Sequence, residues 1–172
     1  LTLNNNETSI TTIEVSGLKV LNKEINLSLT NQPTNKDVTL ENKELYADTE
    51  REEFEDLLKE SGKIIGVITE DNELIAMGVY TKKGYDKSNY AYDIDLKGDD
   101  VLKVAQIEST IVKEEYRGNR LQKIICEELE KFTLDDNVEI LCATASPYNE
   151  FSVNTFKNLG YEIKKDKLKY GG

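Results

Sequence analysis

The chain contains no histidine and no tryptophan, and it has only two cysteines among its 172 residues. The absence of histidine removes the most common general base, the Ser–His and Cys–His pairs, and most zinc sites. Cys126 and Cys142 lie in a helix-like and a strand-like pattern, so we expect buried thiols rather than a disulfide. We therefore expect neither a metal site nor cysteine chemistry.

Positive charge and long apolar runs are also scarce. The 22 basic residues are outnumbered by 33 acidic ones, giving a formal net charge of −11. This balance argues against nucleic acid and anionic membranes as partners. No apolar run approaches the length of a membrane span, and the N-terminus does not resemble a signal peptide, so we expect a cytoplasmic protein. The chain starts at Leu1 and ends in Gly171-Gly172, and we expect that more chain follows this end.

The chain length predicts one domain over residues 13–172, preceded by a flexible, Asn- and Thr-rich segment over residues 1–12. The pattern of apolar residues predicts an α/β sandwich with a mixed sheet. The expected strands are one or two within 13–29, a hairpin over 63–81, and single strands over 89–96, 101–112, 138–146 and 161–170. The strand over 138–146 is expected to be buried on both faces. The expected helices cover 48–61, 119–132 and 149–160.

The segment Tyr116–Gln122, YRGNRLQ, joins an expected strand to an expected helix. A helix start presents unpaired backbone N–H groups and the positive end of the helix dipole, which together suit phosphate. Gly118 allows close approach of the backbone, and Arg117 and Arg120 add charged donors. The alternative is that the two arginines pair with nearby glutamates, namely Glu114, Glu115, Glu127 or Glu128.

A second strand–helix junction lies downstream and contains Asn149, Ser152 three residues later, and Phe156, with Leu159-Gly160-Tyr161 at its end. These residues, together with Arg117–Gln122, resemble two signatures of the GNAT superfamily of acyl-CoA-dependent N-acyltransferases. Arg117–Gln122 stands in the position of that family's R/Q-x-x-G-x-G/A loop. The resemblance covers about residues 22–170. Arg120 and Gln122 depart from that pattern because they stand where the family has glycine or alanine. Phe156 departs as well, because the family often has a tyrosine that protonates the leaving thiolate.

The resemblance implies a GNAT fold, in which a mixed, mostly antiparallel central sheet is flanked by helices and contains a splayed pair of strands. It also implies acetyl-CoA as co-substrate. The residues expected to contact it are Ile111, Val112, Arg117, Gly118, Asn119, Arg120, Leu121, Gln122, Asn149, Ser152 and Phe156. Simpler roles remain open: ordinary ladder positions for Ile111 and Val112, helix capping for Asn149 and Ser152, and core packing for Phe156.

Acetylation of an amine requires a proton acceptor, because an aliphatic amine with a pKa of about 10 is mostly protonated at neutral pH. Glu108 interrupts an apolar strand and is the candidate base, acting directly or through a water that Gln106 orients. Its alternative role is a sheet carboxylate satisfied by a lysine or tyrosine. Tyr148 is the candidate acid for the thiolate, with a packed surface aromatic as its alternative. Tyr90 and Tyr92 are further candidates for the acid, and water can also serve.

The expected function is therefore transfer of an acetyl group from acetyl-CoA to a primary amine by direct attack. The excess of acidic residues, including Asp93 and Asp95, favours a cationic acceptor, either a small molecule or a peptide. We expect the protein to be a monomer or a homodimer. One alternative is a non-catalytic acyl-CoA-binding or regulatory module, favoured by Arg120, Gln122 and Phe156. Another is a structural or interaction domain that binds no CoA.

Overall fold

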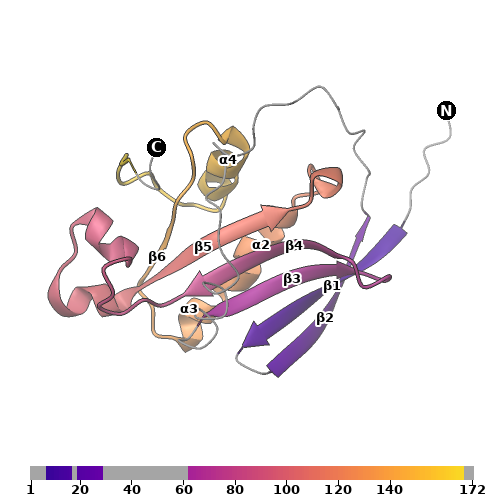
Figure 1. Cartoon of the computed structure of the whole chain (residues 1–172), viewed down its shortest axis with the longest axis horizontal. Helices are drawn as coiled ribbons and strands as arrows, with labels where there is room; N and C mark the ends of the chain where they lie inside the picture. Colours follow the sequence, from indigo (N-terminus) through magenta and orange to yellow (C-terminus); the bar gives the residue numbers. More distant parts are fainter. Residues whose placement is uncertain (1–6, 17–18, 29–61, 169–172) are drawn as a thin grey trace.

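The computed structural model describes residues 7–16, 19–28 and 62–168 of the chain. The helix expected over 48–61 lies outside these residues. Six strands form one sheet in the order β2-β1-β3-β4-β5-β6 (Figure 1). All neighbouring pairs are antiparallel except β5 and β6, which are parallel. The strands are β1 (Glu7–Ser16), β2 (Lys19–Ser28), β3 (Lys63–Thr69), β4 (Leu74–Thr81), β5 (Val104–Val112) and β6 (Ile140–Ala143).

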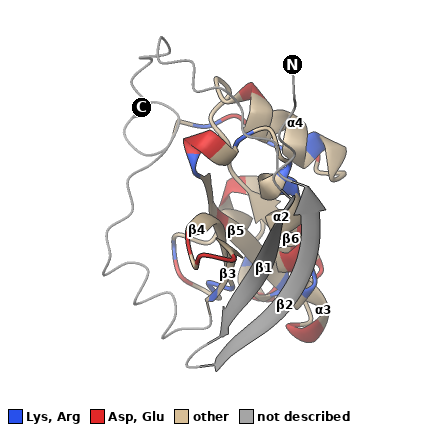
Figure 2. Cartoon of the chain, turned by 90° about the vertical axis from the view of Figure 1, so that its right-hand side faces the viewer, with Lys and Arg blue, Asp and Glu red and all other residues tan. Residues whose placement is uncertain are grey.

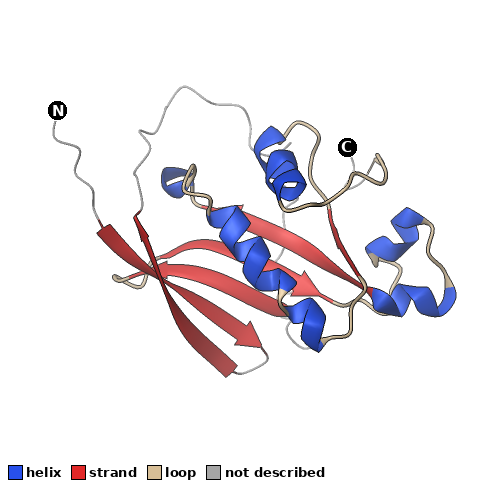
Figure 3. Cartoon of the chain, turned by 180° about the vertical axis from the view of Figure 1, so that it is seen from behind, coloured by secondary structure: helices blue, strands red, loops and turns tan. Residues whose placement is uncertain are grey.

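The helix α2 (Leu121–Glu130) lies across one face of the sheet, as Figure 3 shows. Shorter helices are α3 (Phe132–Asp135), α4 (Glu150–Asn158) and the 3₁₀ turns η2 (Tyr90–Ile94), η3 (Gly98–Lys103) and η4 (Glu114–Tyr116). This arrangement confirms the predicted α/β fold, the hairpin over 63–81 and the helices at 119–132 and 149–160. No helix in the described ranges is both long and apolar enough to cross a bilayer.

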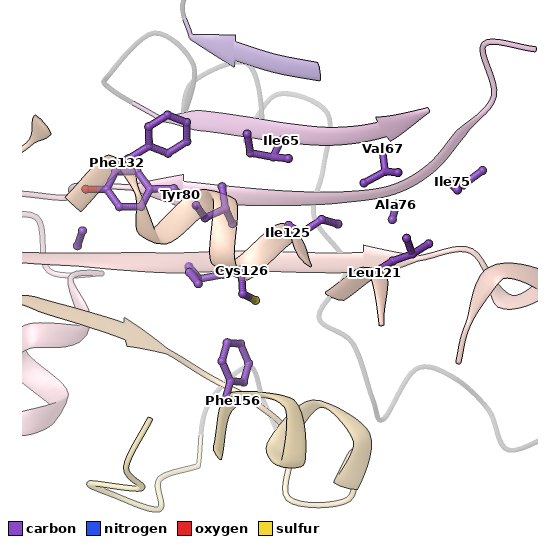
Figure 4. Close-up of a cluster of buried hydrophobic side chains, with 13 residues drawn as sticks. Ile65, Val67, Ile75, Ala76, Tyr80, Leu121, Ile125, Cys126, Phe132 and Phe156 are labelled. Carbon is purple, nitrogen blue, oxygen red and sulfur yellow. The ribbon is translucent and has the colours of Figure 1, made fainter. Parts of the chain in front are cut away.

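The core forms between α2 and the central strands. Leu121, Ile125 and Leu129 recur at helical spacing and are at most 2% exposed. Ile125 lies close to the sheet at Gly78 of β4, where a Cβ would lie 2.3 Å from its Cγ2. Phe156 of α4 adds to the same core and points toward Cys126 of α2 (Figure 4). The apolar stripe of α2 therefore decides which face of the sheet is covered.

The N-terminal strands begin earlier than expected. Residues 7–12 were expected to belong to the flexible segment, but β1 starts at Glu7. From Ile10 to Ser16, β1 pairs with β2 on one side and with β3 on the other. Hydrogen bonds to the neighbouring strands hold this polar segment in a strand, although its composition alone predicts a flexible end.

The strand expected over 89–96 is wrong, because this segment forms η2. The side chain of Asn89 accepts from the N–H of Ala91 and caps the turn. Its Nδ2 also donates to the carbonyls of Gly84 and Val101. The alternation of Tyr90 and Tyr92 has the period of a strand, but local capping by Asn89 decides the conformation.

The last two strand predictions also differ from the structure. β6 is a four-residue edge strand, and Ile140 is 37% exposed, so it is not buried on both faces as expected. Residues 161–168 contain no strand, which corrects the final strand expected over 161–170 within the described part of the chain. Because nothing in that part pairs with its outer edge, β6 stays partly open.

Candidate functional site

The candidate site begins where β5 and β6 separate. Their parallel register runs only from Val104 to Ile107, where Ile107 pairs with Ala143 at the end of β6. In Figure 1, β6 then diverges from β5 toward α4. The edge of β5 from Glu108 to Val112 therefore has no β6 partner, which is the splayed pair that the fold prediction contained.

Glu108 lies at the point of separation. On the other side of β5, Val79 pairs with Ser109 and Tyr80 with Ile107, so Glu108 is the extra residue of a β-bulge. Bulges redirect side chains and are common beside active sites. The carboxylate of Glu108 is half-buried and accepts a short hydrogen bond from Nε2 of Gln106. The bulge thus holds the candidate base beside the opening between the strands.

The buried amide of Gln106 connects Glu108 to η2. Its Oε1 accepts from the backbone N–H of Tyr90 at 2.9 Å. The hydroxyl of Tyr90 lies 3.4 Å from Oγ1 of Thr144, which follows β6 directly. Glu108, Gln106 and Tyr90 therefore form one polar group across the start of the splay.

At the other end of β5, the chain turns through η4 into the loop that opens α2. Gly118 has φ of 83° and Arg120 has φ of 59°, both in the left-handed region. Nδ2 of Asn119 donates to the carbonyl of Tyr116 at 3.0 Å, which stabilises the turn. The first N–H bonded within the helix is that of Ile124, so the earlier N–H groups at the helix start have no intrahelical acceptor. The loop therefore has the backbone geometry of an anion site.

The start of this loop is tied to the β3–β4 hairpin by Glu73. Its carboxylate accepts from Nζ of Lys113 at 2.6 Å and from the hydroxyl of Tyr116 at 2.9 Å. These two donors, with Lys113 the stronger, lower the pKa of Glu73 below its usual range. The contacts connect the start of the loop to the turn between β3 and β4.

Both arginines of the loop are exposed. Nε of Arg117 donates to the carbonyl of Val112 at 3.4 Å, on the stretch of β5 that has no β6 partner. The expected alternative was pairing with Glu114, Glu115, Glu127 or Glu128, and no such ion pair of either arginine is found within the described residues. Glu127 pairs with Lys123 and Glu128 with Lys131 instead. Figure 2 shows the acidic and basic segments distributed over several elements rather than gathered on one. The positive charge at the loop therefore comes from the residues of the loop itself.

A pocket of about 320 Å³ lies between the start of α2 and α4. Its lining residues are Arg120, Lys123, Thr155 and Asn158. The sequence prediction missed the last three of these. The available signal was spacing, because Lys123 follows Arg120 by one helical turn and Thr155 follows Ser152 in the same way. This volume falls at the small end of ligand pockets, and its two cations suit a phosphorylated ligand.

Gln122 stands where the family pattern has a small residue, and it makes a bridge. Its Nε2 donates to Oγ1 of Thr110 on β5 at 3.0 Å and to Oγ of Ser152 on α4 at 2.7 Å. The amide therefore connects three elements and fills space that glycine or alanine would leave open. Leu121 beside it is buried in the core, so only its backbone remains available to a ligand.

The second junction is built as a capped helix. The side chain of Asn149 accepts from the N–H of Ser152 at 3.2 Å, so its capping role is present. Phe156 is 8% exposed, and its ring packs edge-on against Tyr161 with centroids 5.1 Å apart. In this structure Phe156 is therefore a core residue, while Ser152 faces Gln122.

The other candidate groups take no part in the hydrogen bonds that link Glu108, Gln106 and Tyr90. Tyr148 is 79% exposed on the loop after β6. Neither cysteine forms a disulfide, and burial raises the pKa of Cys126 to about 12, so its thiol stays protonated at neutral pH. No three His, Cys, Asp or Glu side chains in the described ranges gather into a metal-binding group.

The model of the acetyltransferase (GNAT) family matches residues 30–161. The chain belongs to this family. Two solved aminoglycoside acetyltransferases have the same fold as this GNAT chain. One is AAC(6')-Iy in complex with the bisubstrate analogue CoA-S-monomethyl-acetylneamine, at 14% identity and TM-score 0.56, covering 76% of this chain and 85% of the other. The second is AAC(6')-Ih from Acinetobacter baumannii, at 17% identity and TM-score 0.54, covering 74% and 84%.

A putative acetyl transferase from Pyrococcus furiosus is similar at 18% identity and TM-score 0.52, covering 69% of this chain and 71% of the other. No curated protein sequence matches this chain closely enough to count as a relative. At these identities the solved structures establish the fold alone. The family match and the local geometry therefore carry the functional proposal for this GNAT protein.

Proposed function

We propose that this chain transfers an acetyl group from acetyl-CoA to a primary amine. The observation that carries the proposal is the position of Glu108, at the bulge where β5 loses its pairing with β6. The same strand leads into the anion-type loop at Gly118 and Arg120. A carboxylate base and an anion-binding loop on one open strand edge suit direct reaction between two bound substrates.

The chain's own residues fit the phosphate-bearing end of acetyl-CoA. Backbone N–H groups at the start of α2 would hold the pyrophosphate, and Arg120 and Lys123 beside the pocket would add charged donors. Arg117 would leave the carbonyl of Val112 and donate to a phosphate instead. The free edge of β5 could then pair with the amide groups of the pantetheine arm. Acetyl-CoA supplies the acetyl group as a thioester whose sulfur can leave as a thiolate.

The base role belongs to Glu108 in this proposal. Its carboxylate takes a proton from the acceptor ammonium, directly or through a water, and so makes the nitrogen nucleophilic. Gln106 holds the carboxylate in place through its amide, and Tyr90 in turn holds Gln106. No covalent bond to the enzyme is required, because positioning of the two substrates lowers the barrier.

The leaving thiolate requires only modest stabilisation, because a free thiol has a pKa of about 8.5. Tyr148 remains the proposed proton donor and would reach the site by movement of its exposed loop. Tyr90 is the rival donor, since its hydroxyl already lies at the strand opening beside Thr144. Tyr148→Phe and Tyr90→Phe separate the two, because only the true donor lowers kcat when its hydroxyl is removed.

The first test is calorimetric titration of acetyl-CoA into the wild type and into Arg117→Ala and Lys123→Ala. We expect each variant to bind about tenfold or more weakly, because each loses a charged donor to phosphate. Lys131→Ala is the matched control, since Lys131 follows the far end of α2 and pairs with Glu128. Equal affinity in all four proteins would overturn the phosphate site.

The second test is thiol release from acetyl-CoA over a panel of primary amines. Glu108→Gln keeps an amide contact with Gln106 but cannot accept the proton, so we expect kcat to fall by about 100-fold or more. Its affinity for acetyl-CoA should stay at the wild-type value. A variant with unchanged kcat would remove Glu108 from the mechanism.

One observation favours a second function, a non-catalytic acyl-CoA-binding module. Gln122 bridges Thr110 of β5 and Ser152 of α4, at a position where the family pattern has a small residue. Such a module binds acetyl-CoA but releases no thiol with any amine, and Glu108→Gln then changes nothing. The same two experiments therefore separate the two functions.

A further inference from the structure

The turn between β3 and β4 lies at the end of the sheet where the chain leaves β5. β4 is antiparallel to β5, so Ala76 near the start of β4 pairs with Val112 at the end of β5 (Figure 1). One further bond continues this ladder, because the N–H of Lys113 donates to the carbonyl of Ile75 at 2.9 Å. The turn is therefore a neighbour of the segment that leads into the loop at Gly118.

Hydrogen bonds within the turn fix its backbone. The N–H of Thr69 donates to the carbonyl of Glu73 at 3.0 Å, and the N–H of Asn72 donates to the carbonyl of Thr69 at 2.9 Å. The N–H of Glu73 donates in return to Oγ1 of Thr69 at 3.2 Å. Asn72 has φ of 62°, a left-handed conformation that asparagine adopts more readily than most residues. The turn therefore presents the side chain of Glu73 from a defined position.

Each oxygen of the Glu73 carboxylate has its own donor on the segment after β5. Oε1 accepts from Nζ of Lys113 at 2.6 Å, and Oε2 accepts from the hydroxyl of Tyr116 at 2.9 Å. The side chains of Lys113 and Glu73 are 44% and 40% exposed, and an ion pair this exposed adds little by itself. The contact with Tyr116 is more sheltered, because the Tyr116 ring packs against the hydrophobic core. Glu73 thus holds the outer end of a ring whose inner part is already packed.

Tyr116 is connected in turn to the centre of the loop. Its carbonyl accepts from Nδ2 of Asn119 at 3.0 Å. Asn119 stands between Gly118 and Arg120, which both have left-handed φ. A series of hydrogen bonds therefore runs from Glu73 through Tyr116 and Asn119 to the loop that opens α2.

We infer that Glu73 is a positioning residue for acetyl-CoA, which acts through Tyr116 on the loop that binds the pyrophosphate and does not itself contact the ligand. The inference rests on the proposed function and adds to it a residue 43 positions before Tyr116 in the sequence. Its physical basis is preorganisation, because N–H groups that already point at the anion need not be ordered when it binds. Without the contact the loop samples other conformations, and the affinity falls with the population of the competent one.

Electrostatics alone predicts the opposite effect of removing Glu73. In a protein of net charge −11, the loss of one carboxylate reduces the repulsion of anionic acetyl-CoA. It also takes away the carboxylate that pairs with Lys113 beside the loop. A positioning role therefore predicts weaker binding of acetyl-CoA by the variant, whereas a purely electrostatic role predicts tighter binding.

The first experiment measures amide hydrogen exchange in the protein without acetyl-CoA. The N–H groups of Tyr116 and Arg117 donate within η4, at 3.0 and 3.1 Å, so their protection reports on the order of the loop's start. Glu73→Ala removes both contacts, and Tyr116→Phe removes only the hydroxyl, with no change in charge. We expect these two amides to exchange about three- to tenfold faster in both variants. The amide of Ile125 in the core of α2 should keep its wild-type rate.

The matched control is Asp71→Asn. Asp71 lies in the same turn, is exposed, and makes no hydrogen bond to the loop in the part of the chain that the structure describes. Its exchange rates should equal those of the wild type. Unchanged exchange at η4 in both Glu73→Ala and Tyr116→Phe overturns the inference, as does an equal increase at Ile125, which would show a loss of stability of the whole fold.

The second experiment is calorimetric titration of acetyl-CoA into the same proteins. We expect Glu73→Ala and Tyr116→Phe each to bind about three- to tenfold more weakly, and Asp71→Asn to bind at least as tightly as the wild type. The double variant Glu73→Ala/Tyr116→Phe should bind no more weakly than Glu73→Ala, because both changes break one contact. Additive losses, or tighter binding by Glu73→Ala, would contradict the positioning role.

Kinetics and the ligand-free measurement separate this inference from the proposed function. In thiol release, KM for acetyl-CoA should rise in both single variants, while kcat and KM for the amine stay at their wild-type values. A lower kcat with unchanged KM for acetyl-CoA would overturn the inference and leave acetyl transfer intact. If the wild type binds no acetyl-CoA, the proposed function fails, and the exchange data still decide whether Glu73 orders the loop.

Discussion

Arg120 occupies a backbone conformation that usually belongs to glycine. Its φ of 59° lies in the left-handed region, and the family pattern has glycine at the same place. The geometry of the loop is thus retained although the residue has changed. Arg120 adds a positive charge to the pocket beside Lys123. Its left-handed conformation costs about 1 kcal/mol of backbone strain.

Two substitutions separate the strain from the charge. Arg120→Gly and Arg120→Ala both remove the guanidinium, but only glycine relieves the left-handed strain. We expect the glycine variant to be more stable than the alanine variant by up to about 1 kcal/mol, measured by urea unfolding. Both should bind acetyl-CoA equally weakly. A glycine variant that binds as tightly as wild type would show that the charge is not used.

At the scale of the elements, the position of α2 depends on Gly78. A Cβ on this residue would lie 2.3 Å from Cγ2 of Ile125 and 3.0 Å from Cδ1 of Leu129. The missing side chain lets the helix approach β4, and the loop at Gly118 is placed by the same contact because it opens α2. Packing in the core and the position of the candidate site are thereby coupled.

Gly78→Ala should destabilise the fold by about 1–3 kcal/mol, because the helix must move or Ile125 must leave its rotamer. Urea unfolding followed by circular dichroism measures this. The double variant with Ile125→Ala removes the clashing methyl, so its cost should be less than the sum of the two single costs. Strict additivity would contradict the close contact.

β6 shows why an element's role depends on its neighbours. The apolar sequence ILCA has the composition of a buried strand, yet it pairs only with the first four residues of β5. Its short length leaves the rest of β5 open, and the open edge is what the candidate site uses. A longer β6 ladder would close the opening at Glu108.

At the scale of the whole molecule, the dominant feature is its charge of −11. A negative field attracts cationic acceptors and repels anionic acetyl-CoA, except near local cations such as Arg117, Arg120 and Lys123. These three cations lie at the loop and its helix, whereas Asp93 and Asp95 at η2 pair with Lys167 and Lys165.

Salt should therefore weaken the acceptor's binding. Between about 0.01 M and 0.1 M salt the Debye length falls from about 30 Å to about 10 Å, so long-range attraction to the protein is screened. We expect KM for spermidine to rise with salt more steeply than KM for butylamine, measured by thiol release. Parallel salt dependences for the two amines would show that the net charge does not guide the acceptor.

Local patterns in the sequence predicted much of the molecule. The pattern of apolar residues predicted the helix over 119–132, which contains α2, and the hairpin over 63–81, which contains β3 and β4. Gly118 at a strand–helix junction predicted the anion-type loop. These features depend on residues close together in the chain, so their physics is contained in short segments.

The tertiary structure alone decided the rest. Three features join residues through the fold: the bulge at Glu108, the bridge from Gln122 to Thr110 and Ser152, and the ion pairs of Lys165 and Lys167 with Asp95 and Asp93. Their partners compete with water and with other side chains, and no local pattern specifies which partner is chosen. The sequence by itself determined the elements and the chemistry available to them, whereas long-range packing determined which groups meet at the open edge of β5.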